Sequence, residues 1–494
     1  MKTQKNSLLL ISILKNSHRN LSCISLFVYL RAKGMDVYLL FIPREQEYCS
    51  RLLVDFLISH VFSLIGISVM TDNFEFAKTI TNDLRELTPD AHICWGGVHP
   101  TLLPEECLAY ADSVCVGEGE IALYSLAQQI DRKETYFNIP GIGCKVNGKI
   151  IVNPPVSLIE NLDSLPVIFY DWERFYIQDS SGLRKFTNSE YTLYSNYNGE
   201  DYTIMTSRGC PFSCTYCCNS YINKLYQTRG KIRRRGVRHV IEEIRMAIKT
   251  VNNIQFINFN DDQFITDKEW NKEFCSAYMK EIGLPFIVRL CPGTFDEADL
   301  QLLKCAGLMF VTMGIQSGSD RTNKEIFKRR FSRSSIIQTS NLLSKNQIYP
   351  YYDVIIRNEL EDDSDRKKTI ELLLELEQPF ALNFFSLTPF PRTELEQIYK
   401  KRSVVPKSSP YGSKSYSNYD ESDSFFQLAY IIPSTTKNIC CFFLENIDSG
   451  HVRRTLDEYY HWIKDTNNKI TLSQLTIQSN PKNHHDLKMK RQTA

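Results

Sequence analysis

Three cysteines close together constrain the fold of this chain more than any other feature. The stretch SRGCPFSCTYCCNS places Cys210, Cys214 and Cys217 in the order Cys-x3-Cys-x2-Cys, directly after the apolar run 202–206. Thiolates are soft ligands, and a loop of this length lets three of them converge on an iron-sulfur cube while one iron keeps no protein ligand. An open iron offers a position at which a substrate or cofactor can coordinate.

A zinc site, or a chance grouping among fifteen cysteines, is the alternative interpretation. Zinc sites usually use four ligands in two paired groups, and no second cysteine pair or His-x3-His lies nearby in the sequence. Cys218 adds a fourth sulfur but directly follows Cys217, so the two can hardly reach one ion from an ordinary loop. The spacing therefore favours an iron-sulfur cluster, and we interpret Cys218 as a packing residue.

The residues around the three cysteines complete a wider pattern. Arg208 and Gly209 precede the first cysteine, Pro211 follows it, and Tyr216 precedes the last one. With them the motif resembles that of the radical S-adenosylmethionine superfamily. The resemblance implies a [4Fe-4S] cluster on the three cysteines, with S-adenosylmethionine bound to the open iron through its methionine amine and carboxylate, and it makes Tyr216 a candidate cofactor-binding residue.

Length and composition set the outer limits. A chain of 494 residues should hold two or three domains, and 58 basic against 57 acidic residues give no indication of nucleic acid or membrane partners. Fifteen cysteines without regular spacing fit a reducing compartment, so we expect a cytoplasmic protein. The start, MKTQKNSLLLISIL, is typical of a signal peptide, but it lacks a small-x-small cleavage site and predicts a buried strand instead. No run is apolar enough for a membrane helix.

Short apolar runs alternate with amphipathic stretches from residue 7 to about 130, which predicts a doubly wound, Rossmann-like parallel sheet. We place a first domain at 1–130. Ligands of such sheets bind at the carboxyl ends of the strands. Polar and glycine residues follow the third, fourth and fifth runs there: Ser68 and Thr71; Gly96, Gly97 and His99; and Gly117, Glu118 and Gly119.

The phrases GISVMT, WGGVHPTLLPEE and DSVCVGEGE resemble the cobalamin-binding domain that precedes the radical core in one large branch of the superfamily. The resemblance implies that Ser68, Thr71, Gly96, Gly97, His99 and Glu118 line a cobalamin pocket. The family's Asp-x-His-x-x-Gly element is replaced by Asn16-Ser17-His18-Arg19-Asn20-Leu21, so His18 is either a lower cobalt ligand or an exposed histidine with basic neighbours. His99 is alternatively a turn residue, and Glu118 and Glu120 are alternatively charges at the start of a helix.

Residues 131–200 break the alternation with prolines and glycines, and we predict a linker or strap there. Within it, KVNGKI reads as a hairpin, because Asn-Gly favours the tight turn that joins two strands. The segment LIENLDSLPVIFYDWE resembles the strap that joins the two domains in this branch. The tyrosine-rich stretch 179–201 is predicted to be a mobile loop.

Six further strand-helix units lie between 201 and 400 and predict a partial (β/α)6 barrel that forms the radical core. The cysteine loop follows the first of these strands, at the end where parallel barrels carry their chemistry. Residues at the other strand ends are candidates for S-adenosylmethionine binding: Asp261 and Asp262, Arg289, Gln316, Ser317 and Gly318, and Glu359 and Glu361. The Asp pair is alternatively a helix cap, and Arg289 alternatively forms a structural ion pair.

The mouth of the predicted barrel departs from the family. MGIQSGSD resembles Gly-Ile-Glu-Ser-Gly-Ser, with Gln316 in place of the glutamate. Asn-Pro-x-Glu-Thr is replaced by Asn358-Glu359-Leu360-Glu361-Asp362, and Pro-Gly-Thr by Pro391-Arg392-Thr393, where a surface contact is expected for Arg392. These departures put substrate specificity in doubt more than cofactor binding. Residues 401–494 are predicted to form a C-terminal extension that ends in a disordered basic tail from Pro481.

Together the resemblances imply an enzyme that uses a [4Fe-4S] cluster, S-adenosylmethionine and cobalamin to methylate an unactivated carbon of a small molecule or natural product. An electron donor such as flavodoxin or ferredoxin is the expected partner. A non-methylating cyclase or rearrangement enzyme, and a degenerate protein that binds cobalamin or a cluster without catalysis, are the alternatives. A transfer RNA methylthiotransferase is disfavoured because the N-terminal domain lacks the extra cysteine triad.

Overall fold

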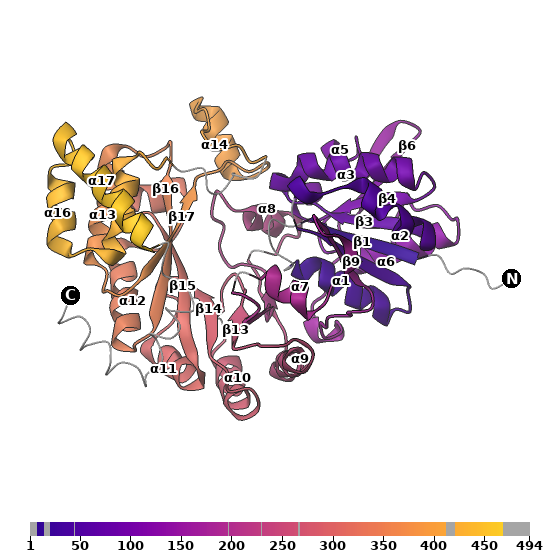
Figure 1. The fold of residues 1–494 in the computed structure, drawn as a ribbon, viewed down its shortest axis with the longest axis horizontal. Coiled ribbons are helices and arrows are strands. Elements are labelled where there is room, and N and C mark those ends of the chain that lie inside the picture. The colour runs from indigo at the N-terminus through magenta and orange to yellow at the C-terminus, as the bar shows by residue number, and fades with distance from the viewer. Residues whose placement is uncertain are drawn as a thin grey trace.

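Two α/β parts lie side by side in the computed structural model, with α8 (Cys218–Leu225) between them (Figure 1). The structure describes residues 7–13, 20–43, 45–195, 197–228, 230–264, 267–411 and 420–467. Each part is built on a parallel sheet, which confirms the predicted fold class. His18 and the tail from Pro481 lie outside the described residues.

The first part contains a nine-stranded sheet in the order β7-β6-β5-β4-β3-β1-β2-β8-β9. Its strands are β1 (Ser7–Ile13), β2 (Val37–Ile42), β3 (Phe62–Ser68), β4 (His92–Gly96), β5 (Ser113–Cys115), β6 (Ile142–Val146), β7 (Lys149–Val152), β8 (Phe175–Asp179) and β9 (Gly182–Lys185). The six strands from β5 to β8 in this order run parallel. The predicted Asn-Gly hairpin is the β6–β7 pair at one edge.

Helices cover both faces of this sheet, so its central strands are apolar on both sides. In β1, Leu8 and Leu10 pack toward α1 (Leu21–Ala32) and α6 (Gly119–Asp131), while Leu9 and Ile11 pack toward the opposite layer. That layer consists of α2 (Val54–Ser59), α3 (Phe74–Leu87), α4 (Val98–Leu102) and α5 (Pro104–Cys107). All seven residues of β1 are buried, as predicted for the apolar start of the chain.

The stretch 179–201 is not a mobile loop, and that prediction was wrong. It pairs β9 with β8 and then forms α7 (Asn188–Leu193), begun by a capping box between Thr187 and Glu190. Tyr191 and Tyr194 are buried, because the tyrosines that gave the segment its polar appearance pack their rings into the core. Sequence composition alone could not separate a tyrosine-rich loop from a segment that covers a sheet edge.

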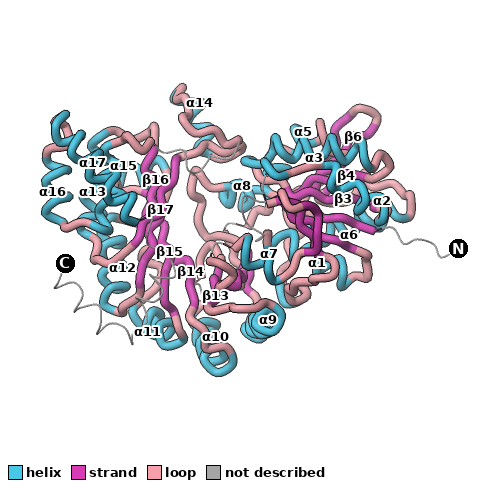
Figure 2. Tube along the Cα trace, in the orientation of Figure 1, coloured by secondary structure: helices cyan, strands magenta, loops and turns pink. Residues whose placement is uncertain are grey.

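The second part is the predicted half-barrel, a six-stranded parallel sheet in the order β10-β13-β14-β15-β16-β17. Its strands are β10 (Asp201–Ile204), β13 (Phe256–Phe259), β14 (Phe286–Leu290), β15 (Leu308–Gln316), β16 (Tyr349–Arg357) and β17 (Ala381–Ser386). The connecting helices are α9 (Val237–Thr250), α10 (Lys268–Glu281), α11 (Glu297–Ala306), α12 (Arg333–Lys345), α13 (Asp363–Glu375) and α14 (Glu394–Arg402). Figure 2 shows α9 to α13 along the outer side of the sheet.

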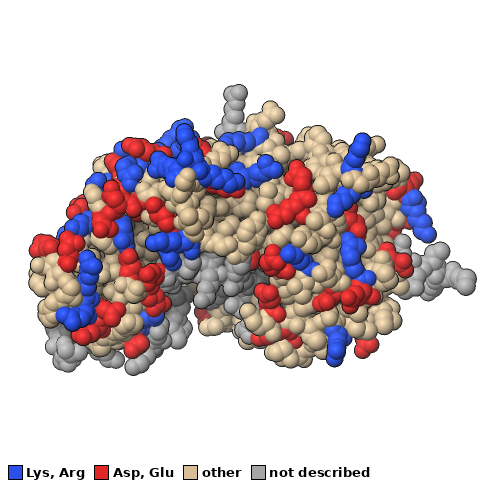
Figure 3. Space-filling view, turned by 90° about the horizontal axis from the view of Figure 1, so that it is seen from above, with Lys and Arg blue, Asp and Glu red and all other residues tan. Residues whose placement is uncertain are grey.

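The chain after 420 adds α15 (Ser424–Ile431) and α16 (Lys437–Glu445) against α13, and α17 (Gly450–Asn467) packs on α15 and α16. No helix in the described ranges is long and apolar enough to cross a membrane. Seen from above, Lys and Arg side chains alternate with Asp and Glu over most of the visible face (Figure 3). This mixture reflects the near-equal numbers of basic and acidic residues in the sequence.

The turn after β8 is held by a buried carboxylate. Arg184 donates from two nitrogens to the two oxygens of Asp179, at 2.6 and 2.9 Å, and the Tyr194 hydroxyl donates to the same group at 2.5 Å. These hydrogen bonds hold the pKa of Asp179 below its usual range, against the opposing effect of burial. The network fixes α7 to the edge of the first sheet.

We expect Asp179→Asn to lower the free energy of unfolding by about 2 kcal/mol, because the amide cannot accept both bonds from Arg184 and leaves Glu190 alone to balance this partly buried cation. Urea denaturation at pH 7 measures this change. Glu173→Gln is the control, since Glu173 is 90% exposed and should shift stability by less than about 0.5 kcal/mol. Equal shifts for the two variants would contradict the role given to Asp179.

Candidate functional site

The cysteine loop leaves the carboxyl end of β10 and runs between the two parts of the molecule. Cys214 is buried, whereas Cys210 and Cys217 are partly exposed. Cys217 precedes α8, and its N–H donates to the Cys214 carbonyl at 3.1 Å. Thr215 anchors the loop from behind, through its N–H to the Phe327 carbonyl at 3.1 Å and its hydroxyl to the Ile326 carbonyl at 2.7 Å. The short loop is therefore held at both its middle and its end.

The pKa values of the three cysteine thiols are all raised. Burial raises the pKa of Cys210 and of Cys214, and the neighbouring thiols raise it further. A hydrogen bond with Cys218 and burial raise the pKa of Cys217. No three His, Cys, Asp or Glu side chains in the described part of the chain form a metal-binding group. Three soft donors on one anchored loop fit an iron-sulfur cluster, whose binding would release the thiol protons.

The two aspartates after β13 have different environments. Asp261 is fully buried and accepts from the Thr206 N–H and hydroxyl, both at 3.0 Å, and from the Ser207 hydroxyl. Asp262 faces the cysteine loop and accepts from Asn219 at 3.0 Å. Neither aspartate caps a helix, since the N-cap of α10 is Asp267. Burial raises the pKa of Asp262, partly offset by the Asn219 hydrogen bond and the charge of Arg289.

The turn after β15 carries the predicted Gln316, Ser317 and Gly318. Gln316 has φ +62°, a left-handed backbone that is costly for a side chain of its size and often marks functional sites. Gly318 is required by space, because a Cβ there would lie 2.2 Å from the Lys368 carbonyl oxygen. Ser317 is buried, and its hydroxyl donates to Glu361 at 2.7 Å. The hydroxyl of Ser317 is thus turned into the protein.

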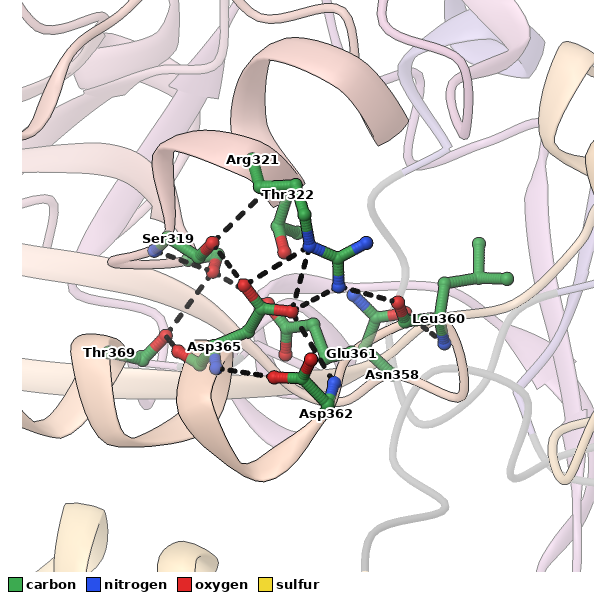
Figure 4. A network of polar contacts seen from close by, with 10 residues as sticks. Ser319, Arg321, Thr322, Asn358, Leu360, Glu361, Asp362, Asp365 and Thr369 are labelled. Carbon is green, nitrogen blue, oxygen red and sulfur yellow. Dashed lines mark hydrogen bonds and ion pairs between the residues drawn. The ribbon is translucent and has the colours of Figure 1, made fainter.

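Glu361 belongs to a polar network that supports this turn (Figure 4). Beside it, the Ser319 hydroxyl donates to Asp365 at 2.5 Å and Arg321 donates to the same carboxylate at 3.1 Å. Burial opposes ionisation of Asp365, but these bonds outweigh it and lower the pKa of Asp365 to about 2. Burial raises the pKa of Glu361 to about 7. The loop 358–362, which replaces the family's Asn-Pro-x-Glu-Thr, therefore keeps a carboxyl group, that of Glu361, which holds the turn after β15 in place.

A cavity of about 500 Å³ lies between the two parts of the molecule. From the first part, Ser68, Gly96, Gly97 and Glu118 line it. From the second part, Cys210, Asp262 and Arg208 line it. Gly97 has φ +101°, and a Cβ there would lie 2.9 Å from the Val69 carbonyl oxygen, so this loop accepts only glycine without strain. The structure thus brings predicted cobalamin-loop residues and a predicted cluster ligand to one cavity.

Thr71 and His99 do not line this cavity. His99 is fully buried in α4, and its Nδ1 lies 3.3 Å from the Thr71 hydroxyl. Burial lowers the pKa of His99 to about 4, so the ring is neutral at neutral pH. It packs against Phe74 at 4.6 Å between ring centroids. These contacts describe a core histidine behind the glycine loop.

Charged side chains join the two parts beside the cavity. Arg233 pairs with Glu118 at 2.5 Å, and Arg208 pairs with Glu120 at 2.6 Å. The short β11–β12 ladder (Ser207–Arg208 with Arg233–Arg234) brings both arginines to this point. Burial opposes the charge on Glu118, but the Arg233 hydrogen bond outweighs it and lowers the pKa. Glu118 precedes α6 without a side-chain capping bond, so its carboxylate serves the contact between the parts.

Three residues of this contact were not predicted from the sequence. They are Arg233, Tyr226 and Arg208, of which Arg208 was recognised only as part of the cysteine motif. The Tyr226 hydroxyl accepts from the Glu118 N–H at 2.9 Å and fills the space that a Cβ at Gly117 would occupy, 1.8 Å away. The basic run KIRRR at 231–235 was the available signal. The pairing of Arg233 with Glu118 could not be identified, because Glu118 lies 115 residues earlier in the chain.

The inner wall of the half-barrel carries Arg289, Asp353 and three aromatic rings. Asp353 accepts from Asn383 at 2.9 Å, and burial raises its pKa despite the attraction of Arg289. Phe310 lies 5.5 Å from Tyr349 and 5.7 Å from Tyr351, ring centroid to ring centroid.

Arg392, in the loop after β17, is about half exposed. Its side chain reaches Glu105 of the first part at 3.8 Å, a surface contact as predicted.

Comparisons with known proteins match both parts of the chain. The family model of the B12 binding domain matches residues 9–127, and that of the radical SAM superfamily matches residues 204–373. A solved structure of the methyltransferase TsrM from Kitasatospora setae, with cobalamin and a [4Fe-4S] cluster bound, is similar at a TM-score of 0.66 and 17% identity, over 81% of this chain and 76% of that one.

Three curated relatives are similar in sequence. An uncharacterized methyltransferase of Pyrococcus horikoshii is 28% identical, over 67% of this chain and 68% of the relative. The cytidylyl-2-hydroxyethylphosphonate methyltransferase of Streptomyces wedmorensis is 28% identical, over 52% and 50%. An anaerobic magnesium-protoporphyrin IX monomethyl ester cyclase of Rubrivivax gelatinosus is 24% identical, over 68% and 58%. The chain thus spans half to two thirds of the length of these relatives.

The raised pKa of Glu361 predicts a pH dependence of stability. Because the native state holds the proton up to about pH 7 while the unfolded chain loses it near pH 4.5, stability should fall as the pH rises between these values. We expect Glu361→Gln to remove this part of the slope, roughly 1–3 kcal/mol, in urea denaturation at pH 5 and pH 8. Glu371→Gln, on the exposed face of α13, should keep the wild-type slope. An unchanged slope in Glu361→Gln would refute the assignment.

Proposed function

This chain belongs to the radical S-adenosylmethionine superfamily and carries a B12-binding domain, and we propose that it is a cobalamin-dependent methyltransferase acting on an unactivated carbon of a small molecule. The observation that carries the proposal is the shared cavity, which is lined by the Gly96-Gly97 loop on one side and by Cys210 and Asp262 on the other. A methyl carrier and a radical-generating cluster must lie close together for such chemistry.

Each group of residues has a proposed task. Cys210, Cys214 and Cys217 hold the [4Fe-4S] cluster, and Gly96 with Gly97 lets cobalamin approach the backbone. When bound, the cluster and S-adenosylmethionine supply an electron and a 5′-deoxyadenosyl radical, and cobalamin supplies the methyl group. Asp262, Arg289 and Gln316 are proposed to bind polar groups of S-adenosylmethionine; Asp262 lines the cavity, and the charge of Arg289 acts on it. The protein contributes binding, orientation and exclusion of water.

The substrate is proposed to bind on the inner wall of the half-barrel. Tyr351 offers an aromatic surface, and Asp353 with Asn383 offers polar partners nearer the carboxyl ends of the strands. A small molecule with both a flat apolar part and a polar group fits this wall better than a long charged polymer. We also propose that an electron donor such as flavodoxin or ferredoxin reduces the cluster.

A non-methylating cyclase is the second candidate, favoured by the resemblance to the magnesium-protoporphyrin cyclases. The two reactions leave different products. A methyltransferase forms methylated substrate together with 5′-deoxyadenosine, whereas a cyclase forms deoxyadenosine without transferring a methyl group. Product analysis with deuterated methyl donor separates them.

The cluster assignment predicts a clear difference between two neighbouring cysteines. We expect Cys214→Ala, reconstituted anaerobically with iron and sulfide, to lose the cluster absorbance and to form no 5′-deoxyadenosine on reduction with S-adenosylmethionine. Cys218→Ala should still load the cluster and form 5′-deoxyadenosine, because Cys218, although its thiol hydrogen-bonds to that of Cys217, is not one of the three proposed ligands. A wild-type protein that loads a full cluster but cleaves no S-adenosylmethionine would contradict the enzyme assignment. It would favour the alternative, a degenerate protein that binds a cluster or cobalamin without catalysis.

The glycine loop predicts the behaviour of cobalamin. We expect Gly97→Ala to weaken cobalamin retention at least tenfold, about 1.4 kcal/mol, because the added Cβ strains a backbone at φ +101° and meets the Val69 carbonyl. The ratio of cobalamin to protein after gel filtration measures this, with iron content as an internal check. Gly182→Ala is the control, since Gly182 has φ +108° but nothing within 4 Å of its Cβ position. Full retention in Gly97→Ala would exclude this loop from the cobalamin site.

A further inference from the structure

Arg329 is a buried guanidinium directly behind the cysteine loop. Only 8% of its surface is exposed, and it follows the segment 326–327 that anchors Thr215. Its Nη1 donates to the Tyr216 hydroxyl at 2.8 Å and lies 3.9 Å from the Sγ of Cys214. Its Nη2 donates to the Gly314 carbonyl at 2.6 Å, and its guanidinium stacks on Phe331 at 4.9 Å. The cation is thus fixed in place on three sides.

None of these contacts supplies a negative charge. In the part of the chain that the structure describes, no carboxylate forms an ion pair with Arg329, and its hydrogen-bond partners are the Gly314 carbonyl, the Tyr216 hydroxyl and the thiols of Cys214 and Cys291, none of which is charged at pH 7. Asp353 attracts Arg329 only at longer range and hydrogen-bonds to Asn383 instead. Burying an unpaired cation costs several kcal/mol, so such groups are normally found beside an anion.

We propose that the missing anion is the iron-sulfur cluster and that Arg329 sets its reduction potential. This inference rests on the proposed function, because it requires that Cys214 ligates the cluster. A fixed cation beside a ligating sulfur favours the electron-rich state, since reduction adds one negative charge to the cluster. Arg329 is a positioning and tuning residue in this role and touches no substrate.

The cation also has a structural alternative, which is to hold Tyr216 and the bulge of β15 in place. Gly314 lies where β15 shifts register against β16, and Arg329 donates to its carbonyl. A purely structural role predicts loss of stability without a change in the potential of a cluster that still loads. The reduction potential therefore separates the two roles.

The test compares Arg329→Gln, Arg329→Lys and Arg330→Gln with wild type, each reconstituted anaerobically and matched for iron and sulfide content. Arg330 is the matched control, because it is the next residue and also an arginine but is exposed. Midpoint potentials are measured by electron paramagnetic resonance in a redox titration without S-adenosylmethionine. If Arg329→Gln does not fold, Arg329→Met, of similar length and without charge, takes its place.

We expect loss of the charge at 329 to make reduction about tenfold less favourable, a shift of about 59 mV to more negative potential for one electron. Arg329→Lys should lie closer to wild type, and Arg330→Gln should match it. A neutral variant at 329 with a full cluster and a wild-type midpoint would overturn the proposal, as would an equal shift in Arg330→Gln. A wild-type protein that loads no cluster would instead refute the proposed function itself.

Discussion

The ion pairs between Glu118 and Arg233 and between Glu120 and Arg208 determine how the two halves of this molecule meet. Glu118 and Glu120 lie at the start of α6, whereas the arginines come from the short ladder beside the cysteine loop. Arg233 and Glu120 are almost fully buried, so each charge depends on its partner, and removal of one would leave the other uncompensated. The contact therefore fixes the distance between the glycine loop and the cysteine loop, and with it the cavity.

Within the half-barrel, carboxyl groups also hold neighbouring loops in place, over shorter distances in the sequence. Asp261 lies in the loop after β13 and accepts hydrogen bonds from Thr206 and Ser207, which start the cysteine loop. Glu361 lies in the loop after β16 and accepts a hydrogen bond from Ser317 in the turn after β15. In both cases a carboxyl group in the loop after one strand positions the loop of the neighbouring strand. These contacts hold the loops at the carboxyl edge of the sheet in fixed positions, which is what catalysis by orientation requires.

The sequence allowed the fold to be predicted closely, because each buried strand reads as a short apolar run and each helix as an amphipathic one. All six strands of the half-barrel lie between residues 201 and 400, where the sequence predicted six strand-helix units. The stretch 179–201 failed, since Tyr191 and Tyr194 are polar by composition but buried by tertiary contacts. The candidate site was harder to predict. Cys210 and Gly97 could be recognised locally, whereas Arg233, Tyr226 and Arg329 acquire their roles only from partners distant in sequence.

The placement of the cavity couples the two cofactors through the protein. A ligand that contacts both halves binds only the arrangement in which they are docked, and so stabilises that arrangement in proportion to its affinity and concentration. The docked arrangement in turn presents Cys210 and Asp262 to the same cavity as Ser68 and Gly97. Tyr226 strengthens the coupling, because α8 begins at the cysteine loop and Tyr226, at its end, bonds to the backbone of Glu118. Order in the cysteine loop therefore favours order at the cobalamin loop, and the reverse holds by the same thermodynamic linkage.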